Sequence, residues 1–143
     1  MNSSPECQAQ ALMTLEGVSQ TYRIGDRIIP ILRNISLTLW RGKTCALLGA
    51  SGSGKSTLMN ILGCLDQPTS GEYMLDGSDV SRMSRNELAA VRNRKIGFIF
   101  QSFNLLPRLS AIGNVSLPMM YNMDDLTDAE QHQRAVAALT AVG

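Results

Sequence analysis

Aromatic and cysteine residues are scarce in this sequence of 143 residues, and long apolar runs are missing. Aromatic residues make up 5%, and the three cysteines, Cys7, Cys45 and Cys64, are odd in number and form no C-x-x-C pair. A disulfide framework is therefore not expected, and a reducing compartment is favoured. No run reaches the roughly 18 apolar residues of a membrane-spanning helix, and the N-terminus has neither a basic start nor an apolar stretch. These absences predict a cytosolic protein that does not itself cross a membrane.

Net charge is also nearly absent, at +1 at pH 7, so the sequence gives no reason to expect nucleic acid as a partner. With 44% hydrophobic and 17% charged residues, the chain is apolar enough for one folded domain. One basic group lies on a predicted helix without aromatic residues between its members, which is typical of a solvated helical face. Its members are Arg82, Arg85, Arg92, Arg94 and Lys95.

The most informative motif is Gly49-Ala50-Ser51-Gly52-Ser53-Gly54-Lys55-Ser56, which matches G-x-x-x-x-G-K-[ST] at every fixed position. Its glycines let backbone N–H groups approach a polyphosphate with no Cβ in the way. Lys55 adds a mobile positive charge for the outer phosphates, and Ser56 offers a hydroxyl to a magnesium ion. The motif predicts a nucleotide site, and the alternative is a Gly/Ser-rich linker that matches by chance.

The segments around this loop supply the context that the motif needs. Residues 45–48 form a continuous apolar run that predicts a buried strand, and Leu58, Ile61 and Leu62 follow at helical spacing. The opening third predicts a small antiparallel sheet, with strands at 12–22, 28–32 and 35–40 and turns at 25–26 and 41–43.

The short strand Tyr73–Leu75 follows a turn-rich segment and ends at Asp76-Gly77. An apolar run ending in Asp can also begin a Walker B magnesium site. Because a glycine occupies the place of the catalytic acid, we interpret Asp76 as a turn residue.

Beyond this strand the sequence predicts a helix and a second buried strand. Ser84–Arg92 reads as a helix with Leu88 and Val91 facing inward, and the apolar run Ile96–Phe100 predicts the strand, which ends at Gln101. A short apolar segment at 114–120 is broken by a proline.

The capping box Thr127-Asp128-Ala129-Glu130 opens a final helix with Val136 and Leu139 facing inward. His132, the only histidine, lies on this helix with no evident partner. We interpret it as a structural or surface residue.

With the phosphate loop, Gln101 at a strand end and Tyr22 upstream of the loop, the chain resembles the ATP-binding subunit of ABC transporters from about Leu12 onward. Residues 49–66 and 96–101 resemble the macrolide-export and lipoprotein-release branch. The resemblance implies an α/β fold: an incomplete P-loop NTPase core with an N-terminal antiparallel β subdomain and the start of an α-helical subdomain. The expected divisions are a polar tail at 1–11, the N-terminal part of the ATP-binding domain at 12–102, and the start of the helical subdomain at 103–143.

The resemblance also implies ATP and Mg²⁺ as ligands. Tyr22 would stack on adenine, Lys55 would bind the β- and γ-phosphates, and Gln101 would contact magnesium or the attacking water. The candidate catalytic residues are thus Lys55 and Gln101. The candidate magnesium ligands are Ser56 and Gln101. Nucleotide contacts are expected from Tyr22, Gly49, Ala50, Ser51, Gly52, Ser53, Gly54, Lys55, Ser56 and Thr57. The alternatives are an ordinary strand aromatic for Tyr22 and a polar strand cap for Gln101.

The partners implied are a transmembrane transporter subunit, on which 103–120 would dock, and a second ATP-binding subunit. The chain would then lie in the cytoplasm, on the inner face of the cell membrane. Nucleic acid is not expected.

Members of this family continue into a Leu-Ser-Gly-Gly-Gln signature, a Walker B strand ending in Asp-Glu and a switch histidine, and this sequence ends at Gly143 before all three. We therefore expect it to hold ATP without turning it over. Its two buried strands would lack neighbours and expose apolar faces and unpaired edges. The expectation is a part of a longer protein, a truncated gene product or an unstable fragment.

Two other functions stay open on the sequence. One is a non-hydrolysing ATP-binding or regulatory subunit, and the other is a different P-loop enzyme, such as a GTPase or a small-molecule kinase. An Asn-Lys-x-Asp guanine reader is missing, and the nearest string is Asn122-Met123-Asp124-Asp125. ATP is therefore expected over GTP.

Overall fold

The computed structural model describes residues 10–121 and 126–143, in two compact units, Met1–Leu88 and Ala89–Gly143. Most of the predicted polar tail, with Cys7, lies outside the described residues, as does the string 122–125. Each unit is described by itself below.

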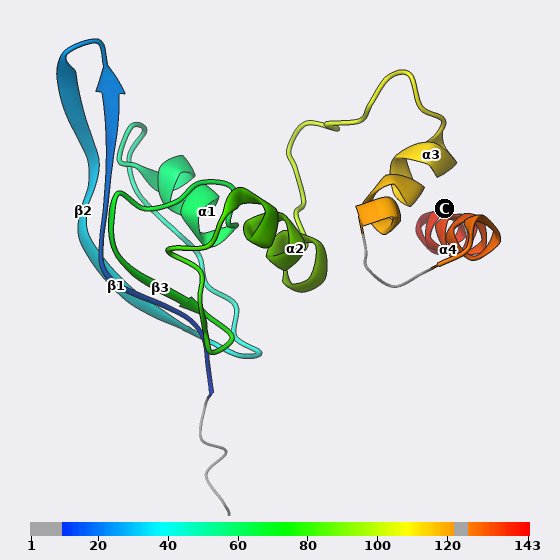
Figure 1. Ribbon diagram of the computed structural model, residues 1–143, viewed down its shortest axis with the longest axis horizontal. Helices are drawn as coiled ribbons and strands as arrows, with labels where there is room; N and C mark the ends of the chain where they lie inside the picture. The colour runs from blue at the N-terminus through cyan, green and yellow to red at the C-terminus, as the bar shows by residue number, and fades with distance from the viewer. Residues whose placement is uncertain (1–9, 122–125) are drawn as a thin grey trace, which may run out of the picture. The chain divides into compact units, whose positions relative to one another are not determined.

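A four-stranded antiparallel sheet forms the base of the first unit (Figure 1). Its strands are β1 (Ala11–Ile24), β2 (Arg27–Trp40), β3 (Ser70–Leu75) and β4 (Ser78–Asp79), in the order β2-β1-β3-β4. Leu15 of β1 pairs with Leu37 on one side and with Tyr73 on the other. The predicted antiparallel sheet is confirmed. The two strands predicted at 28–32 and 35–40 are one, because the irregularity at Asn34, with φ 50°, is absorbed as a bulge.

The turns predicted at 25–26 and at Asp76-Gly77 are present, and both are hairpin turns. Gly25 and Asp26 join β1 to β2, and Asp76 and Gly77 join β3 to β4 with φ of 49° and 76°. Two residues with positive φ between antiparallel strands are the geometry that Asp-Gly favours. Because Asp76 lies in this turn, its interpretation as a turn residue is confirmed, and its carboxylate forms an ion pair with Arg41.

Helix α1 (Lys55–Leu62) follows the glycine-rich loop and ends at Gly63, as predicted. It buries Leu58 and Ile61, whereas Met59 on its other side is 55% exposed. Helix α2 (Arg85–Lys95) begins one residue later and ends three residues later than predicted, and it buries Leu88. Burial of these apolar side chains is what stabilises the unit. The core of the first unit consists of Leu15, Val18, Leu32, Leu58, Ile61, Cys64, Tyr73, Leu75, Val80 and Leu88.

Residues 45–48 and 96–100 are not strands, and the prediction of two buried strands is wrong here. Leu48 is 88% exposed, and Ile99 is fully exposed. A buried parallel strand needs a hydrogen-bonding neighbour, and the sheet built from the described residues consists of β2, β1, β3 and β4 alone. The expected exposure of their apolar residues is observed, with the rings of Phe98 and Phe100 stacked on each other at 5.6 Å.

The second unit contains the rest of α2, the helices α3 (Ala111–Ser116) and α4 (Asp128–Val142), and the 3₁₀ helix η1 (Leu117–Tyr121). Helices α3 and α4 pack against each other. Thr127 and Glu130 form the predicted capping box at the start of α4.

The inward face of α4 differs from the prediction. Ala135 is fully buried and Leu139 is partly buried, whereas Val136 is 40% exposed, so Val136 was assigned to the wrong face. His132 is exposed, in agreement with its interpretation as a surface residue. Within 10–121 and 126–143, no helix has both the length and the apolar character needed to span a bilayer.

Candidate phosphate-binding site

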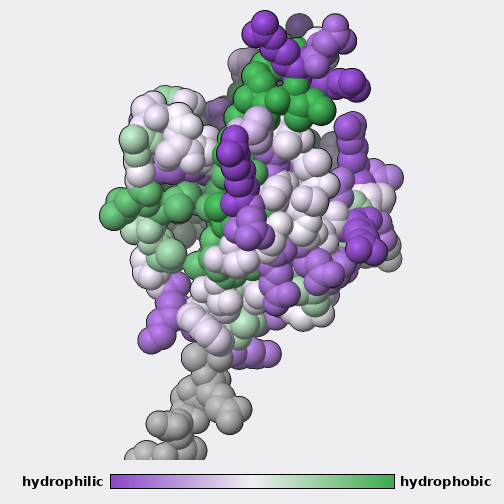
Figure 2. All heavy atoms as spheres, turned by 90° about the vertical axis from the view of Figure 1, so that its left-hand side faces the viewer, coloured by the Kyte–Doolittle hydropathy of each residue, from purple (hydrophilic) through white to green (hydrophobic). Residues whose placement is uncertain are grey.

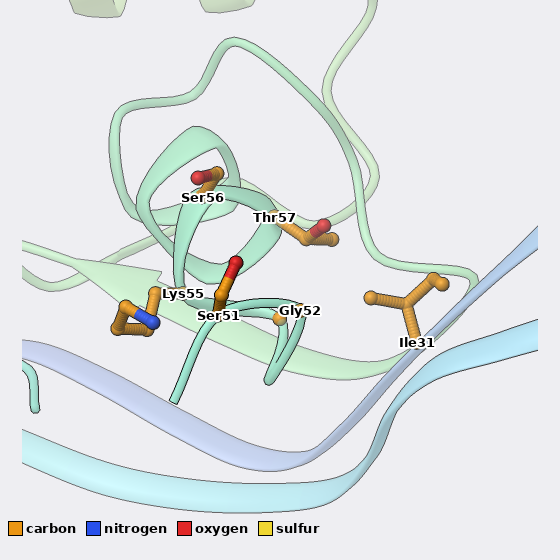
Figure 3. A pocket seen from close by; sticks show the side chains of 7 residues that line it. Ile31, Ser51, Gly52, Lys55, Ser56 and Thr57 are labelled. Carbon is orange, nitrogen blue, oxygen red and sulfur yellow. The ribbon is translucent and has the colours of Figure 1, made fainter. Parts of the chain in front are cut away.

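The loop 49–54 runs directly into α1 and encloses a cavity of about 590 Å³ (Figure 3). Its volume lies in the range of small-molecule sites. Ser51 and the first residues of α1 lie on one side of the cavity, and Ile31 of β2 lies on the other. The lining residues are Ile31, Ser51, Gly52, Gly54, Lys55, Ser56 and Thr57.

Two glycines of the loop are required by its geometry. Gly54 has φ 89°, and a Cβ there would lie 2.8 Å from Cδ2 of the buried Leu32. A Cβ on Gly49 would lie 2.8 Å from the Ser53 hydroxyl oxygen. The loop therefore lies tight against β2 on one side and against itself on the other.

The N-terminus of α1 is open to the cavity, which its first residues line. Gly54 gives it no side-chain cap, and its first turn holds no acidic residue. The first N–H groups of a helix have no partner within the helix, and they sit at the positive end of its dipole. By contrast, Ser84, Ser110 and Thr127 accept a hydrogen bond at the starts of α2, α3 and α4. The start of α1 is thus suited to an anion.

Lys55 places a second positive group at the same point. Its Nζ donates hydrogen bonds to the carbonyl oxygens of Gly49 at 2.8 Å and Ala50 at 2.6 Å. The side chain is curled back along its own loop (Figure 3). Since its partners are neutral carbonyls, the ammonium charge is available to an anion, with which its hydrogen bonds would be stronger.

Hydroxyl groups complete the chemistry of the cavity. Ser56 lies exposed in the first turn of α1, next to Thr57. Hard oxygen donors of this kind, together with phosphate oxygens, are what Mg²⁺ prefers. Among the described residues no group of three or more His, Cys, Asp or Glu side chains converges, so the phosphates would supply most of the ligands.

Tyr22 lies on β1 in the same unit, half-exposed, and its hydroxyl donates a hydrogen bond of 2.9 Å to Asp66 Oδ2. It is not among the residues that line the cavity. Gln101 lies in the second unit, exposed, in a bend rather than at the end of a strand. Its role in the site stays a prediction.

The sequence patterns missed one residue that lines the cavity, Ile31, and one that contacts Tyr22, Asp66. Ile31 lies on β2 beside the cavity, and the packing of Gly54 against β2 brings it there. Asp66 carries no motif of its own, and its contact with Tyr22 spans 44 residues.

Known proteins resemble the chain over most of its length. A family model described as ABC transporter matches residues 32–143. The chain is 53% identical over 132 residues to the macrolide export ATP-binding/permease protein MacB of Syntrophobacter fumaroxidans, covering 92% of this chain and 18% of that protein. It is 52% identical to the uncharacterized ABC transporter ATP-binding protein YvrO of Bacillus subtilis, covering 92% and 57%.

Among solved structures, a dimeric post-hydrolysis state of the ATP-binding cassette MJ0796 bound to ADP and Pi matches with a TM-score of 0.80 and 41% identity. That match covers 90% of this chain and 56% of the other. The chain thus spans about half the length of the cassettes it matches, and a smaller part of the MacB proteins.

Proposed function

The chain belongs to the ABC transporter family, and from this we propose that it is part of an ATP-binding subunit that energises transport through ATP binding and hydrolysis. The observation that carries the proposal is the position of Lys55. Its Nζ lies within the loop 49–54, at the start of α1, whose first turn has neither a side-chain cap nor an acidic residue. Both features suit a polyphosphate.

For the phosphate end of ATP, we propose that Lys55 exchanges the carbonyls of Gly49 and Ala50 for oxygens of the β- and γ-phosphates. The N–H groups of the loop and of the first turn of α1 donate to the same phosphates, and Ser56 offers its hydroxyl to Mg²⁺. Bound Mg²⁺ supplies charge neutralisation on the phosphates. The nucleotide contacts proposed along this loop are Gly49, Ala50, Ser51, Gly52, Ser53, Gly54, Lys55, Ser56 and Thr57.

For the base end, we propose that the half-exposed ring of Tyr22 stacks on adenine. Stacking of a base on an aromatic ring is worth about 1–3 kcal/mol in nucleic-acid complexes. Ile31 supplies an apolar wall to the cavity between the phosphate loop and β2. We also propose that Gln101 joins the site at the magnesium ion or the attacking water.

The finer proposal on turnover is that these 143 residues bind ATP without hydrolysing it. Hydrolysis needs a water held and oriented in line with the γ-phosphate. Asp76 is held in an ion pair with Arg41, and His132 is exposed on α4. We propose that neither residue orients that water.

We propose two partners and a location for the whole subunit. The relatives named as ATP-binding/permease proteins support a transmembrane partner, and the dimeric cassette supports a second ATP-binding subunit. The subunit would lie in the cytoplasm, against the inner face of the membrane. Residues 12–102 would be the N-terminal part of the ATP-binding domain, and 103–143 the start of the helical subdomain that meets the partner.

The test is Mg²⁺-dependent ATP binding to the 143-residue chain, measured by calorimetry. Loss of a charge-assisted hydrogen bond of about 1.5–3 kcal/mol predicts that Lys55→Ala weakens binding by about ten- to a hundredfold. The control is Lys43→Ala, which removes the same charge from an exposed turn outside the cavity. Equal ATP affinity of Lys55→Ala and the parent chain would contradict the proposal.

Two further measurements separate the alternatives. ATP should displace a bound fluorescent nucleotide better than GTP does, and a GTP preference would favour another class of P-loop enzyme. Release of inorganic phosphate from ATP by the purified chain, lost in Lys55→Ala, would overturn the proposal that the chain does not hydrolyse ATP.

A further inference from the structure

Asp66 lies just beyond the end of α1 and joins two segments that are distant in sequence. Its Oδ2 accepts hydrogen bonds from the Tyr22 hydroxyl at 2.9 Å and from Gln20 Nε2 at 3.4 Å. Its Oδ1 accepts a hydrogen bond from the backbone N–H of Gln67 at 2.9 Å. Both carboxylate oxygens therefore have partners, and the carboxylate is held in one orientation.

The partners of Asp66 are themselves fixed. Gln20 is only 4% exposed, and its Oε1 accepts hydrogen bonds from the backbone N–H of Thr69 at 2.9 Å and from the Thr69 hydroxyl at 3.2 Å. The Thr69 hydroxyl oxygen in turn accepts a hydrogen bond of 3.1 Å from the backbone N–H of Thr21. Tyr22, the neighbour of Thr21, is thus connected to the segment after α1 through backbone and side-chain hydrogen bonds.

Tyr22 needs such a tether because its surroundings restrain it little. It is 38% exposed and lies where the β1–β2 hairpin leaves the core, paired with Ile29. Beyond it, Ile24 and Ile28 are each 66% exposed. Figure 2 shows this hairpin end at the top of the molecule, with apolar and charged side chains open to solvent. The hydrogen bond from its hydroxyl to Asp66 fixes the direction of the Tyr22 ring.

We propose that Asp66 is a positioning residue for the nucleotide base, which orients the ring of Tyr22 through its hydroxyl. The inference rests on the proposed role of Tyr22 in stacking on adenine. Helix α1 begins at the phosphate loop and, after Gly63, leads to Asp66. At about 1.5 Å per residue, its eight residues extend for about 12 Å. The same helix therefore sets both the phosphate contacts and the anchor of the ring, and so the separation between the two parts of the site.

The test compares two probes on the full 143-residue chain in the presence of Mg²⁺: ATP, and inorganic tripolyphosphate, which has no base. Tyr22→Phe keeps the ring and removes the hydroxyl, and Asp66→Ala removes the acceptor. Each should weaken ATP binding by about three- to tenfold, the range expected for one hydrogen bond, and leave tripolyphosphate binding unchanged. Because both changes break the same contact, the double variant should bind ATP about as well as either single variant.

Two controls separate a specific effect on base binding from a general loss of structure. Asp26→Ala removes a carboxylate from the turn of the same hairpin and should leave the binding of both probes unchanged. Thermal unfolding of each variant reports whether it is folded, and Tyr22→Phe, which preserves nearly the whole side chain, keeps the test valid if Asp66→Ala does not fold.

Separate results overturn the inference and the proposed function. If Tyr22→Ala weakens ATP binding but Tyr22→Phe and Asp66→Ala do not, Tyr22 stacks on the base without help from Asp66, and the inference is wrong. Equal loss of ATP and tripolyphosphate binding in Asp66→Ala would make Asp66 a structural residue and also overturn it. If Lys55→Ala changes the affinity of neither probe, the proposed function itself fails.

Discussion

The ammonium group of Lys55 lies 2.6 Å from the carbonyl oxygen of Ala50, within the loop that precedes it. A second hydrogen bond, of 2.8 Å, joins it to the carbonyl oxygen of Gly49. The Lys55 ammonium is thus bound to its own loop. A phosphate group must displace two carbonyl oxygens to form hydrogen bonds with it. The shape of this cation should therefore matter as much as its charge.

Lys55→Arg tests this point. Arginine keeps the charge, but its planar guanidinium is larger than an ammonium and cannot fit between two carbonyl oxygens in the same way. We expect ATP binding to weaken by about tenfold or more, while the midpoint of urea unfolding changes little, because the side chain lies at the edge of the core. Calorimetry and urea titration measure the two effects. Parent-like ATP affinity in Lys55→Arg would show that charge alone suffices.

Gly54→Ala should destabilise the first unit. The added Cβ meets Cδ2 of Leu32 at 2.8 Å, in a backbone conformation with φ 89° that side chains disfavour. The two effects together predict a loss of about 2–4 kcal/mol in the free energy of unfolding. Gly52→Ala is the matched control, because φ is 77° there and no atom lies within 4 Å of the added Cβ. Equal losses in the two variants would mean that contact with Leu32 adds nothing.

Tyr73→Phe tests the core below α1. The hydroxyl of Tyr73 donates a hydrogen bond of 2.7 Å to the carbonyl oxygen of Leu62, and the side chain is 1% exposed. Removing it leaves that carbonyl without this donor, at an expected cost of about 1–2 kcal/mol in the free energy of unfolding. Urea unfolding near neutral pH measures this cost.

Tyr73 should also give the chain a dependence on alkaline pH. Burial, followed by the influence of Cys64, raises the pKa of its hydroxyl well above the ordinary value of 10.0. A group whose pKa is raised on folding stabilises the fold below its unfolded pKa, and this contribution is lost as pH rises from about 10 towards the folded value. Unfolding free energies should therefore fall less steeply above pH 10 in Tyr73→Phe than in the parent chain. Identical slopes would show that folding does not raise the pKa of the Tyr73 hydroxyl.

Glu130 should make the stability of the start of α4 depend on pH in the acid range, with the opposite sign. Its side chain accepts hydrogen bonds from the Thr127 backbone N–H at 2.8 Å and from the Thr127 hydroxyl at 2.7 Å, and these lower its pKa from the ordinary value of 4.5. Their contribution is present above pH 4.5 and is lost as pH falls through the lowered value. Amide exchange at the start of α4 should accelerate over this range in the parent chain. In Glu130→Gln, the acceleration should be absent, whereas Asp128→Asn should retain it.

Local patterns were enough to predict the antiparallel sheet, the turns at 25–26 and 76–77, α1 and the capping box of α4. Each depends on residues a few positions apart, such as Asp76 and Gly77 or Thr127 and Glu130. The apolar runs 45–48 and 96–100 also read as strands, but a strand exists only when another strand accepts its hydrogen bonds, and apolar character does not supply that partner. Val136 was misplaced because two adjacent apolar residues on a helix leave its inward face ambiguous by one position.

The phosphate loop was predicted in full from its motif, since the requirement for glycines and a lysine is local. The cavity residue Ile31 and the Tyr22 partner Asp66 were not predicted, because both contacts are tertiary. Ile31 reaches the cavity from β2, and Asp66 meets Tyr22 across 44 residues. Neither position carries a signal in its immediate neighbours.

Two adjacent residues of β2 lie in different environments. Ile31 lines the cavity, whereas Leu32 is buried in the core against Gly54. A ligand that orders the loop therefore also orders the strand on which the core is built. A ligand that binds only the folded chain therefore raises the free energy of unfolding of the first unit. Saturation at about a hundred times Kd would add about 2.7 kcal/mol to the free energy of unfolding. The melting temperature of the chain is thus itself a reporter of what binds there.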